Sequence, residues 1–217
     1  MDKLPDEEIL EKYFVEKFPD KILDEEAYHL LLLVLEEKPG VFVMSADYSD
    51  RELLHCFCDE FDLEMAVKEG GSRSLLDRIL RRDTRFIKDS VFITRKEERF
   101  DVLEDSNGEI KGFSDREIGE FLGYPEDAIE FYEEHEIPGK FFEKRIIEFV
   151  DNGDLSQEEV ELLGLLGYLP APNMESVEDA VGVAEEREDR LVEFDSEMGL
   201  DIGSRYLSKM KDQQKIN

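Results

Sequence analysis

The first half of the chain contains four stretches in which apolar residues recur every three or four positions. This is the spacing of an amphipathic helix. Each stretch stops at a proline, a glycine or a polar turn, and residues of these kinds end helices. We therefore predict helices over residues 6–18, Asp24–Leu35, Ser49–Phe61 and Ser74–Arg82.

Short runs rich in β-branched and aromatic residues lie between these helices. They cover Val41–Met44, Leu63–Val67 and Ser90–Thr94, and their length and composition are typical of buried strands. Strands that alternate with helices favour an α/β unit with a mainly parallel sheet. The pattern therefore predicts a small α/β domain over residues 1–106.

A turn at Asn107-Gly108 and Gly112 marks a change in pattern. Beyond it β-branched runs disappear, which predicts an all-helical domain over residues 112–217. Three of its helices begin with a Ser followed three residues later by an acid, a pair that satisfies the free amides of a helix start. These pairs are Ser114/Glu117, Ser156/Glu159 and Ser176/Asp179. The predicted helices are Ser114–Leu122, Pro125–Glu134, Gly139–Val150, Gln157–Leu166, Ser176–Met198 and Leu200–Lys211.

The charge of the chain bears on its surface and its solvent. Of 217 residues, 57 are Asp or Glu and 27 are Lys or Arg, which gives a formal net charge of −30. The acids occur along the whole chain rather than in one tail. We interpret this as adaptation of the whole surface to high salt, where screening shortens the range of self-repulsion. A salt-loaded archaeal cytoplasm is the setting that fits.

No segment indicates export or a membrane. The longest apolar block, Leu30–Leu35, is much shorter than the ~20 residues that span a bilayer. The N-terminus MDKLPDEEIL lacks the charged-then-apolar pattern of a signal peptide. Cys56 and Cys58 are the only cysteines, and their separation by one residue excludes a disulfide framework. We expect a soluble, cytoplasmic protein with no membrane partner.

The stretch Phe113–Tyr132 has the spacing of a helix-turn-helix. Gly119 would let two helices approach, Gly123 would turn the chain and Ile129 would pack beneath. DNA-binding units need cations for phosphate, yet the second helix, Pro125–Glu136, carries six acids and neither Lys nor Arg. Nucleic acid is therefore a disfavoured partner. The simpler interpretation is a core role for the aromatic residues here and their neighbours: Tyr124, Pro125, Phe131, Tyr132, Phe141 and Phe142.

Two segments of the second half resemble the frame of an archaeal family, domain of unknown function number 483. They are Gly123-Tyr124-Pro125, followed by Ile129–Tyr132, and the later segment Tyr168–Pro172. The likeness covers about Ser114–Arg187, a third of the chain. In that family the first segment is followed by paired cysteines, and the later segment carries a third. Here those positions hold other residues, so the resemblance implies a fold and an archaeal origin but no activity. The residues at the cysteine positions are Asp127, Ala128 and Ala171.

One segment is net positive within this acidic chain. Residues 72–99 hold nine Lys or Arg against five acids, a net charge of +4. On a helix the arginines would share one side, and the preceding Gly-Gly-Ser turn could present backbone amides to a phosphate or carboxylate. We predict an anion-binding surface; the alternatives are pairing with the acidic coat or docking between the two domains. The candidate residues are Gly70, Gly71, Ser72, Arg73, Arg78, Arg81, Arg82 and Arg85.

Other chemistry is only weakly indicated. His55 and Cys58 lie one helical turn apart, but a tetrahedral metal site needs two further ligands. The alternative is a packed thiol beside a surface histidine. The nucleotide-binding patterns GxxxxGKS/T and GxGxxG are absent, so no cofactor is predicted. GxSxG and HExxH are absent too, so no catalytic residue is identified.

Three hypotheses for function remain open at this point. The leading one is a non-catalytic binding or regulatory protein that contacts a protein partner or a small anionic ligand through the arginine-rich helix. The second is a transcription regulator that uses Ser114–Glu134. The third is an enzyme with an anion-binding pocket at Gly70–Arg73 and unknown catalytic residues. The sequence does not predict an oligomeric state.

Overall fold

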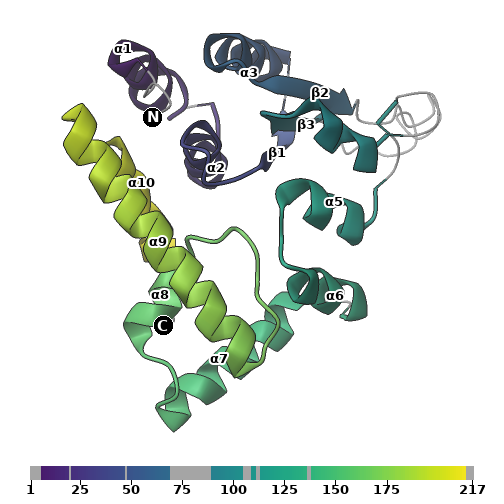
Figure 1. Ribbon diagram of the computed structural model, residues 1–217, viewed down its shortest axis with the longest axis vertical. Coiled ribbons are helices and arrows are strands. Elements are labelled where there is room, and N and C mark those ends of the chain that lie inside the picture. Colours follow the sequence, from purple (N-terminus) through teal and green to yellow (C-terminus); the bar gives the residue numbers. More distant parts are fainter. Residues whose placement is uncertain are drawn as a thin grey trace, which may run out of the picture.

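The computed structural model describes residues 6–19, 21–46, 48–68, 89–104, 109–110, 113–135 and 138–213. Within them a small sheet lies beside α2 (Asp24–Val34) and α3 (Tyr48–Phe61). The chain then continues through a series of helices, and the last helix returns to lie against α2 (Figure 1). An α/β first half followed by a helical second half is thus confirmed.

The helices agree with the predicted ones in place and nearly in extent. The predicted helix over residues 6–18 is wound in two ways, as α1 (Glu7–Leu10) and a π-helical segment, η1 (Glu11–Lys17). The predicted helix Ser74–Arg82 lies outside the described residues. The remaining elements are a 3₁₀ helix, η2 (Glu97–Val102), α5 (Asp115–Leu122), α6 (Glu126–Glu134), α7 (Pro138–Asn152), α8 (Gln157–Leu163), α9 (Met174–Met198) and α10 (Ile202–Gln213).

The three predicted strands are present, but the prediction of a mainly parallel sheet is wrong. The strands are β1 (Gly40–Ala46), β2 (Glu64–Lys68) and β3 (Asp89–Thr94). Their order is β1-β3-β2, and β3 pairs antiparallel with both neighbours. β1 and β2 do run in the same direction, as a β-α-β connection through α3 requires. They are not adjacent, because β3 is inserted between them.

Alternate residues of the strands face two different cores. Phe92 of β3 pairs with Phe42 and Ala66, and these side chains face a smaller cluster that contains Phe121 of α5. The neighbouring residues, Val91 and Ile93, face the main core. Both faces of the sheet are therefore covered, as the continuous apolar runs of its strands require.

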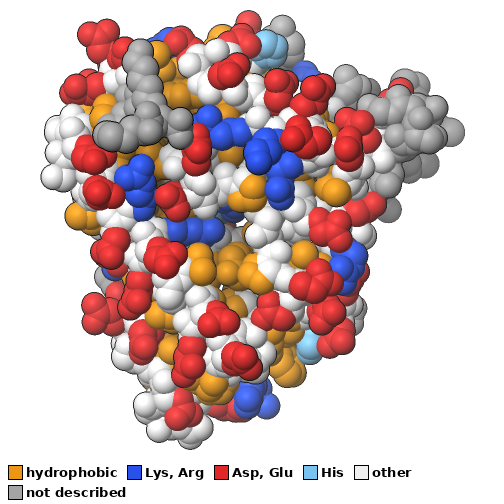
Figure 2. Space-filling model, viewed as in Figure 1, with side chains coloured by type: hydrophobic (Ala, Val, Ile, Leu, Met, Phe, Trp, Pro, Cys, Tyr) orange, Lys and Arg blue, Asp and Glu red, His pale blue; other side chains and the backbone are white. Residues whose placement is uncertain are grey.

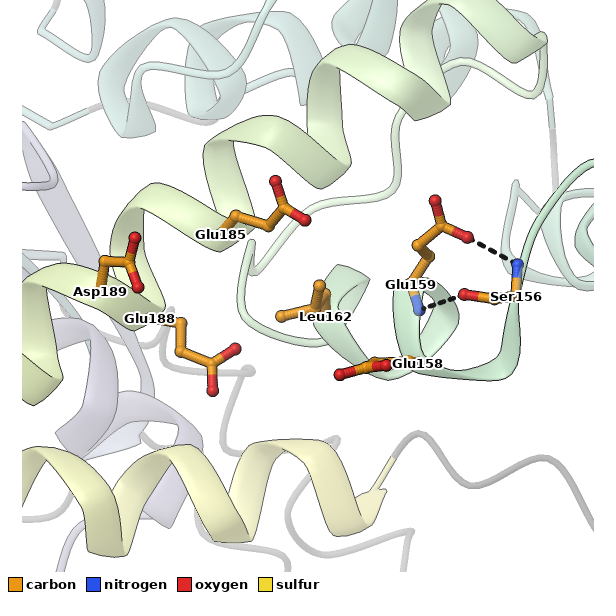
Figure 3. A pocket seen from close by; sticks show the side chains of 7 residues that line it. All are labelled: Ser156, Glu158, Glu159, Leu162, Glu185, Glu188 and Asp189. Carbon is orange, nitrogen blue, oxygen red and sulfur yellow. Dashed lines mark hydrogen bonds between the residues drawn. The ribbon is translucent and has the colours of Figure 1, made fainter.

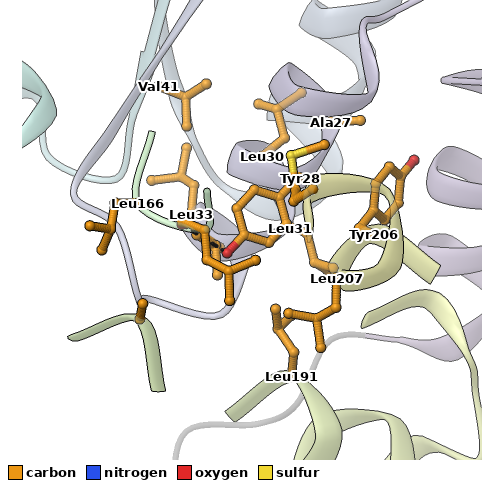
Figure 4. Packing of buried hydrophobic residues seen from close by; sticks show 14 of the residues in the cluster. Ala27, Tyr28, Leu30, Leu31, Leu33, Val41, Leu166, Leu191, Tyr206 and Leu207 are labelled. Carbon is orange, nitrogen blue, oxygen red and sulfur yellow. Dashed lines mark hydrogen bonds between the residues drawn. The ribbon is translucent and has the colours of Figure 1, made fainter. Parts of the chain in front are cut away.

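The main core is centred on α2. Every residue from Ala27 to Val34 is buried, so this helix is enclosed on all sides rather than along one stripe. Its side chains meet Val41 of β1, Leu166 of the α8–α9 connection, and Tyr206 and Leu207 of α10 (Figure 4). Residues from both predicted domains thus build one core. The division at residues 106–112 stays a prediction.

Two of the three predicted Ser–acid caps are present. The Ser114 side chain accepts from the Glu117 amide, and the Glu117 carboxylate accepts from the Ser114 amide at 2.7 Å. Ser156 and Glu159 repeat this arrangement. The Ser176 cap is wrong, because α9 already begins at Met174 and Asn173 Oδ1 accepts from the Ser176 amide at 3.0 Å. Asn is as good an N-cap as Ser.

The C-terminal end of α5 packs closely against β1 and η2 through the Phe121 carbonyl. A Cβ on Gly40 of β1 would lie 2.7 Å from the Phe121 carbonyl oxygen, so only glycine fits there. Arg99 of η2 donates to the same carbonyl, from Nε at 3.1 Å and from Nη2 at 2.9 Å. This carbonyl at the end of α5 is thereby satisfied inside the protein.

The surface is acidic over the face seen in Figure 2. Asp and Glu side chains are spread across it rather than gathered in one region, with fewer Lys and Arg between them. Within the described ranges no helix combines the length and the apolar character needed to cross a membrane.

Candidate functional site

The arginine-rich surface predicted from the sequence cannot be located, because its residues lie outside the described ones: Gly70, Gly71, Ser72, Arg73, Arg78, Arg81, Arg82 and Arg85. The next arginine along the chain, Arg95, donates to the Leu33 carbonyl from Nε at 3.0 Å and to the Val34 carbonyl from Nη2 at 2.6 Å. Arg95 therefore satisfies the end of α2, as Arg99 does for α5. The anion-binding surface stays a prediction.

His55 and Cys58 are placed in different environments on α3. The His55 ring is exposed, and its Nδ1 lies 3.2 Å from Asp59 Oδ2. Cys58 is buried in the main core, where burial raises the pKa of its thiol to about 12. A metal needs the thiolate. In the described part of the chain, no group of three or more His, Cys, Asp and Glu side chains is arranged to hold a metal ion.

A close Gly119–Ile129 contact and the ion pairs of Arg116 hold α5 and α6 together. A Cβ on Gly119 would lie 2.7 Å from Cγ1 of Ile129. Arg116, the sole Lys or Arg between Asp115 and Glu134, forms ion pairs with Glu126 at 2.6 Å and Glu133 at 2.7 Å. Its charge is already used within the pair. Within the described residues 113–135, no Lys or Arg is therefore left unpaired for a phosphate; the low expectation of DNA binding stays a prediction.

A hollow of about 630 Å³ lies beside this pair, between α6, α7 and the segment that leads into α9. We call it the α6–α7 recess. The spacing of the α6 residues, at positions i, i+3, i+4 and i+7, places them on one face of that helix. The recess is lined by Asp127, Glu130, Phe131, Glu134, His135, Phe141, Arg145, Ala171, Pro172 and Asn173.

Three rings in mutual, tilted contact form one wall of the recess. The centroid of the His135 ring lies 4.6 Å from the centroids of both Phe131 and Phe141, and these two lie 6.0 Å from each other. His135 Nδ1 lies 2.9 Å from the Phe131 carbonyl oxygen; because a carbonyl only accepts, Nδ1 carries the proton and Nε2 is the acceptor of the neutral ring. Phe131 is buried, but Phe141 is 44% exposed. The predicted core role is therefore wrong for Phe141.

The charged rim of the recess is negative. Asp127, Glu130 and Glu134 form no ion pair with any described residue. The one cation of the lining, Arg145, forms an ion pair with Glu148, and its guanidinium lies 5.0 Å from the centroid of the Phe149 ring. Its Nε also donates to the Pro172 carbonyl at 3.5 Å. Arg145 is thus engaged by α7 and by the segment that leads into α9, while the three carboxylates of α6 remain available.

Two of the three positions that the family resemblance assigns to cysteines meet in this recess. Asp127 and Ala171 both line it, although 44 positions separate them in the chain. The third, Ala128, is fully buried and does not line the hollow. The recess therefore brings together Asp127 and Ala171, while the resemblance that relates these positions to cysteines stays a prediction.

A second acidic hollow, of about 570 Å³, lies between α8 and α9 (Figure 3). Its lining has one apolar side chain, Leu162, and several of its polar groups already have partners. Glu159 and Ser156 cap α8, and Glu188 accepts from Lys211 at 2.8 Å. The remaining carboxylates are Glu158, Glu185 and Asp189. Clustered acids are expected somewhere on so acidic a surface, and nothing else distinguishes this one.

A buried polar joint connects the two halves of the chain. Three tyrosine hydroxyls reach the α8–α9 connection: Tyr28 donates to the Leu165 carbonyl at 3.0 Å, Tyr124 to the Gly167 carbonyl at 2.6 Å, and Tyr132 accepts from the Leu169 amide at 3.1 Å. Arg187 donates to the Leu165 and Leu166 carbonyls. These side chains provide hydrogen-bond partners for the backbone of a connection that has no regular secondary structure.

Lys38 and His29 lie in the same joint. Gly167 has φ +73°, and a Cβ there would lie 2.3 Å from His29 Nε2, so both backbone and space require glycine. Burial lowers the pKa of Lys38 to about 7, with a further contribution from Arg187. Burial and the neighbouring Lys38 and Arg187 lower the pKa of His29. His29 Nδ1 has no hydrogen-bond partner among the described residues. The joint therefore favours neutral forms of both side chains.

Sequence reasoning missed most of the recess. It singled out Asp127 and Ala171 by resemblance, and Phe131 and Phe141 as core aromatics. It did not find Glu130, Glu134, His135 or Arg145. The available signal was the row of acids along one face of α6, which is uninformative in a chain with 57 acids.

Comparison with protein-family models, with curated proteins and with solved structures finds no significant match for this chain.

Proposed function

We propose that this protein is a non-catalytic binding protein and that the α6–α7 recess is its contact surface for a partner. The observation that carries the proposal is the exposure of Phe141. Its side chain is 44% exposed beside an open hollow, and its ring packs against His135 in a tilted contact. An apolar centre bounded by polar groups is the usual composition of a recognition surface.

The recess is also built on rigid elements, which supports the same proposal. α6 is joined to α5 by the Arg116 ion pairs, and the segment that leads into α9 ends at the Asn173 cap. Tyr132 of α6 accepts from the Leu169 amide at the start of that segment. A pre-organised surface loses less conformational entropy when a partner binds.

The proposal is tested with three fluorescein-labelled peptides in which leucine and alanine alternate with lysine, glutamine or glutamate. We expect saturable binding of at least one peptide in fluorescence anisotropy. Phe141→Ala should weaken it by about tenfold or more, because exposed aromatic anchors dominate such contacts. The matched control is Val192→Ala, which shortens an apolar side chain of α9 that is 51% exposed. No binding of any peptide, or equal losses in both variants, would remove the proposal.

A second contact of opposite sign is proposed for the arginine-rich segment, on the strength of its net charge of +4 over residues 72–99. The same titration tests it. The glutamate peptide would bind, and Arg78→Glu combined with Arg81→Glu and Arg85→Glu would abolish that binding. An unchanged titration would exclude this contact. We propose a salt-adapted archaeal cytoplasm as the setting for both contacts, from the net charge of −30.

A further inference from the structure

We infer that the partner of the α6–α7 recess is a basic, partly apolar protein segment, and that a lysine or arginine side chain of this segment enters the recess. The inference rests on the proposed function and names the chemical class of the partner. It is drawn from the unpaired carboxylates, from the exposed aromatic ring and from the contrast with the second acidic hollow.

The carboxylates provide charge without internal compensation. Asp127, Glu130 and Glu134 share one face of α6 and all line the recess, and none forms an ion pair with a described residue. Glu126 and Glu133 of the same helix are held by Arg116. The helix thus neutralises the acids that face α5 and leaves those that face the recess free for a cation from outside.

The aromatic wall suits the same kind of side chain. A cation over the face of an aromatic ring is attracted by the ring quadrupole, and Phe141 has an exposed ring within the lining. Long basic side chains also bury an apolar stem while the charged head stays near polar groups. An apolar stem against Phe141 and Pro172, with the charged head at the α6 carboxylates, satisfies both halves of the lining.

The hollow between α8 and α9 shows what charge alone would provide. It has as many carboxylates without an ion pair to a described residue, Glu158, Glu185 and Asp189, but its lining has no aromatic side chain. The long-range field of a chain with net charge −30 attracts any cation to both places. If the recess is a specific site, removing three carboxylates there must weaken peptide binding more than removing three carboxylates from the α8–α9 hollow. The second hollow is therefore a matched control.

The experiment uses the full chain and the same labelled lysine, glutamine and glutamate peptides. One variant carries Asp127→Asn, Glu130→Gln and Glu134→Gln. The control variant carries Glu158→Gln, Glu185→Gln and Asp189→Asn, which changes the net charge by the same amount. We expect the lysine peptide to bind best, the recess variant to bind it about tenfold more weakly, and the control to stay within about twofold, as three exposed ion pairs of ordinary strength imply. Thermal melting of each variant verifies that it is folded.

Each other outcome overturns the inference in a recognisable way. Equal losses in the two variants mean that only the net field acts. Binding of the glutamine or glutamate peptide as tight as that of the lysine peptide, abolished by Phe141→Ala, leaves the recess as a binding surface but removes the cationic partner. Spermidine is a small organic cation without an apolar stem like that of a peptide. If it displaces the lysine peptide as effectively as a peptide of equal charge does, the site binds small organic cations rather than a protein segment. If no peptide binds, the proposed function fails together with the inference.

Discussion

Lys38 is buried, with 4% of its surface exposed, and no described carboxylate forms an ion pair with it. The positive charge of Arg187 lowers the pKa of Lys38 further, and the negative charge of Glu25 offsets this in part. The ammonium lies 5.6 Å from the centroid of the Tyr124 ring. A charged amine in such surroundings is costly, and the usual response is loss of the proton.

We predict that stability rises with pH between pH 7 and pH 9 because of Lys38. The pKa of Lys38 is about 7 in the folded protein, whereas the ordinary value of a solvated lysine, which applies to the unfolded chain, is 10.5. Within this window the unfolded chain binds a proton that the folded chain does not, and stability then increases with pH. Lys38→Met should flatten the rise and stabilise the protein at pH 7 by a few kcal/mol, on the order of 1.4 per pH unit of the shift.

The measurement is the free energy of unfolding in urea at several pH values. Lys140→Met, at an exposed position of α7, is the control and should keep the rise. The comparison stays below pH 9, because the raised pKa of Cys58 acts in the opposite direction above its ordinary value of 9.0. A slope that is the same in wild type and Lys38→Met would show that Lys38 is not neutral when folded.

The elements show which parts of a fold a sequence can specify. Short runs rich in β-branched and aromatic residues located all three strands, because such runs report which residues are buried. They do not report which strand is the neighbour. β3 pairs with β1 and β2 through contacts distant in the chain, so the parallel order inferred from β-α-β succession was wrong. Helix starts were similarly underdetermined at α9, where Asn173 and Ser176 are equally suitable caps.

The recess was even less accessible to sequence reasoning. It joins one face of α6, the first turns of α7 and the segment at Ala171, and only the packed structure brings these together. Aromatic spacing predicted burial for both Phe131 and Phe141. Spacing alone cannot show that Phe141 falls at the edge of the core, since that depends on where the neighbouring elements end.

We predict a measurable coupling between Gly119 and Ile129 at the α5–α6 contact. Gly119→Ala introduces a Cβ 2.7 Å from Ile129 Cγ1, so the helices must shift, at a cost of roughly 1–3 kcal/mol. In an Ile129→Ala background the space is free. The same change should then be neutral or stabilising, because Ala exceeds Gly in helix propensity by about 1 kcal/mol. Urea unfolding of the four proteins gives the coupling energy. Equal effects in both backgrounds would mean that the close approach is absent.

At the scale of the molecule, α10 returns from the helical half to the N-terminal segment. The Tyr206 hydroxyl donates to the Phe14 carbonyl at 3.2 Å, and Lys209 forms an ion pair with Asp24. Together with the polar joint at Gly167, these contacts join α10 and the α8–α9 connection to η1 and α2. Repulsion between carboxylates on the surface therefore acts on elements of both halves that share one core.

The excess of acidic residues causes such repulsion, and we predict that added salt stabilises the protein. With 57 acids against 27 Lys or Arg, the compact state concentrates negative charge that the unfolded chain disperses. Screening is nearly complete at about 1 M salt, where the Debye length is ~3 Å. The melting temperature should therefore rise by roughly 5–10 °C up to about 1 M and then level off, as relief of a few kcal/mol implies for a chain of this length. Sodium chloride and tetramethylammonium chloride should act alike, since screening depends on ionic strength. A melting temperature that is constant up to this concentration, or that rises only with sodium chloride, would show that self-repulsion is not the cause.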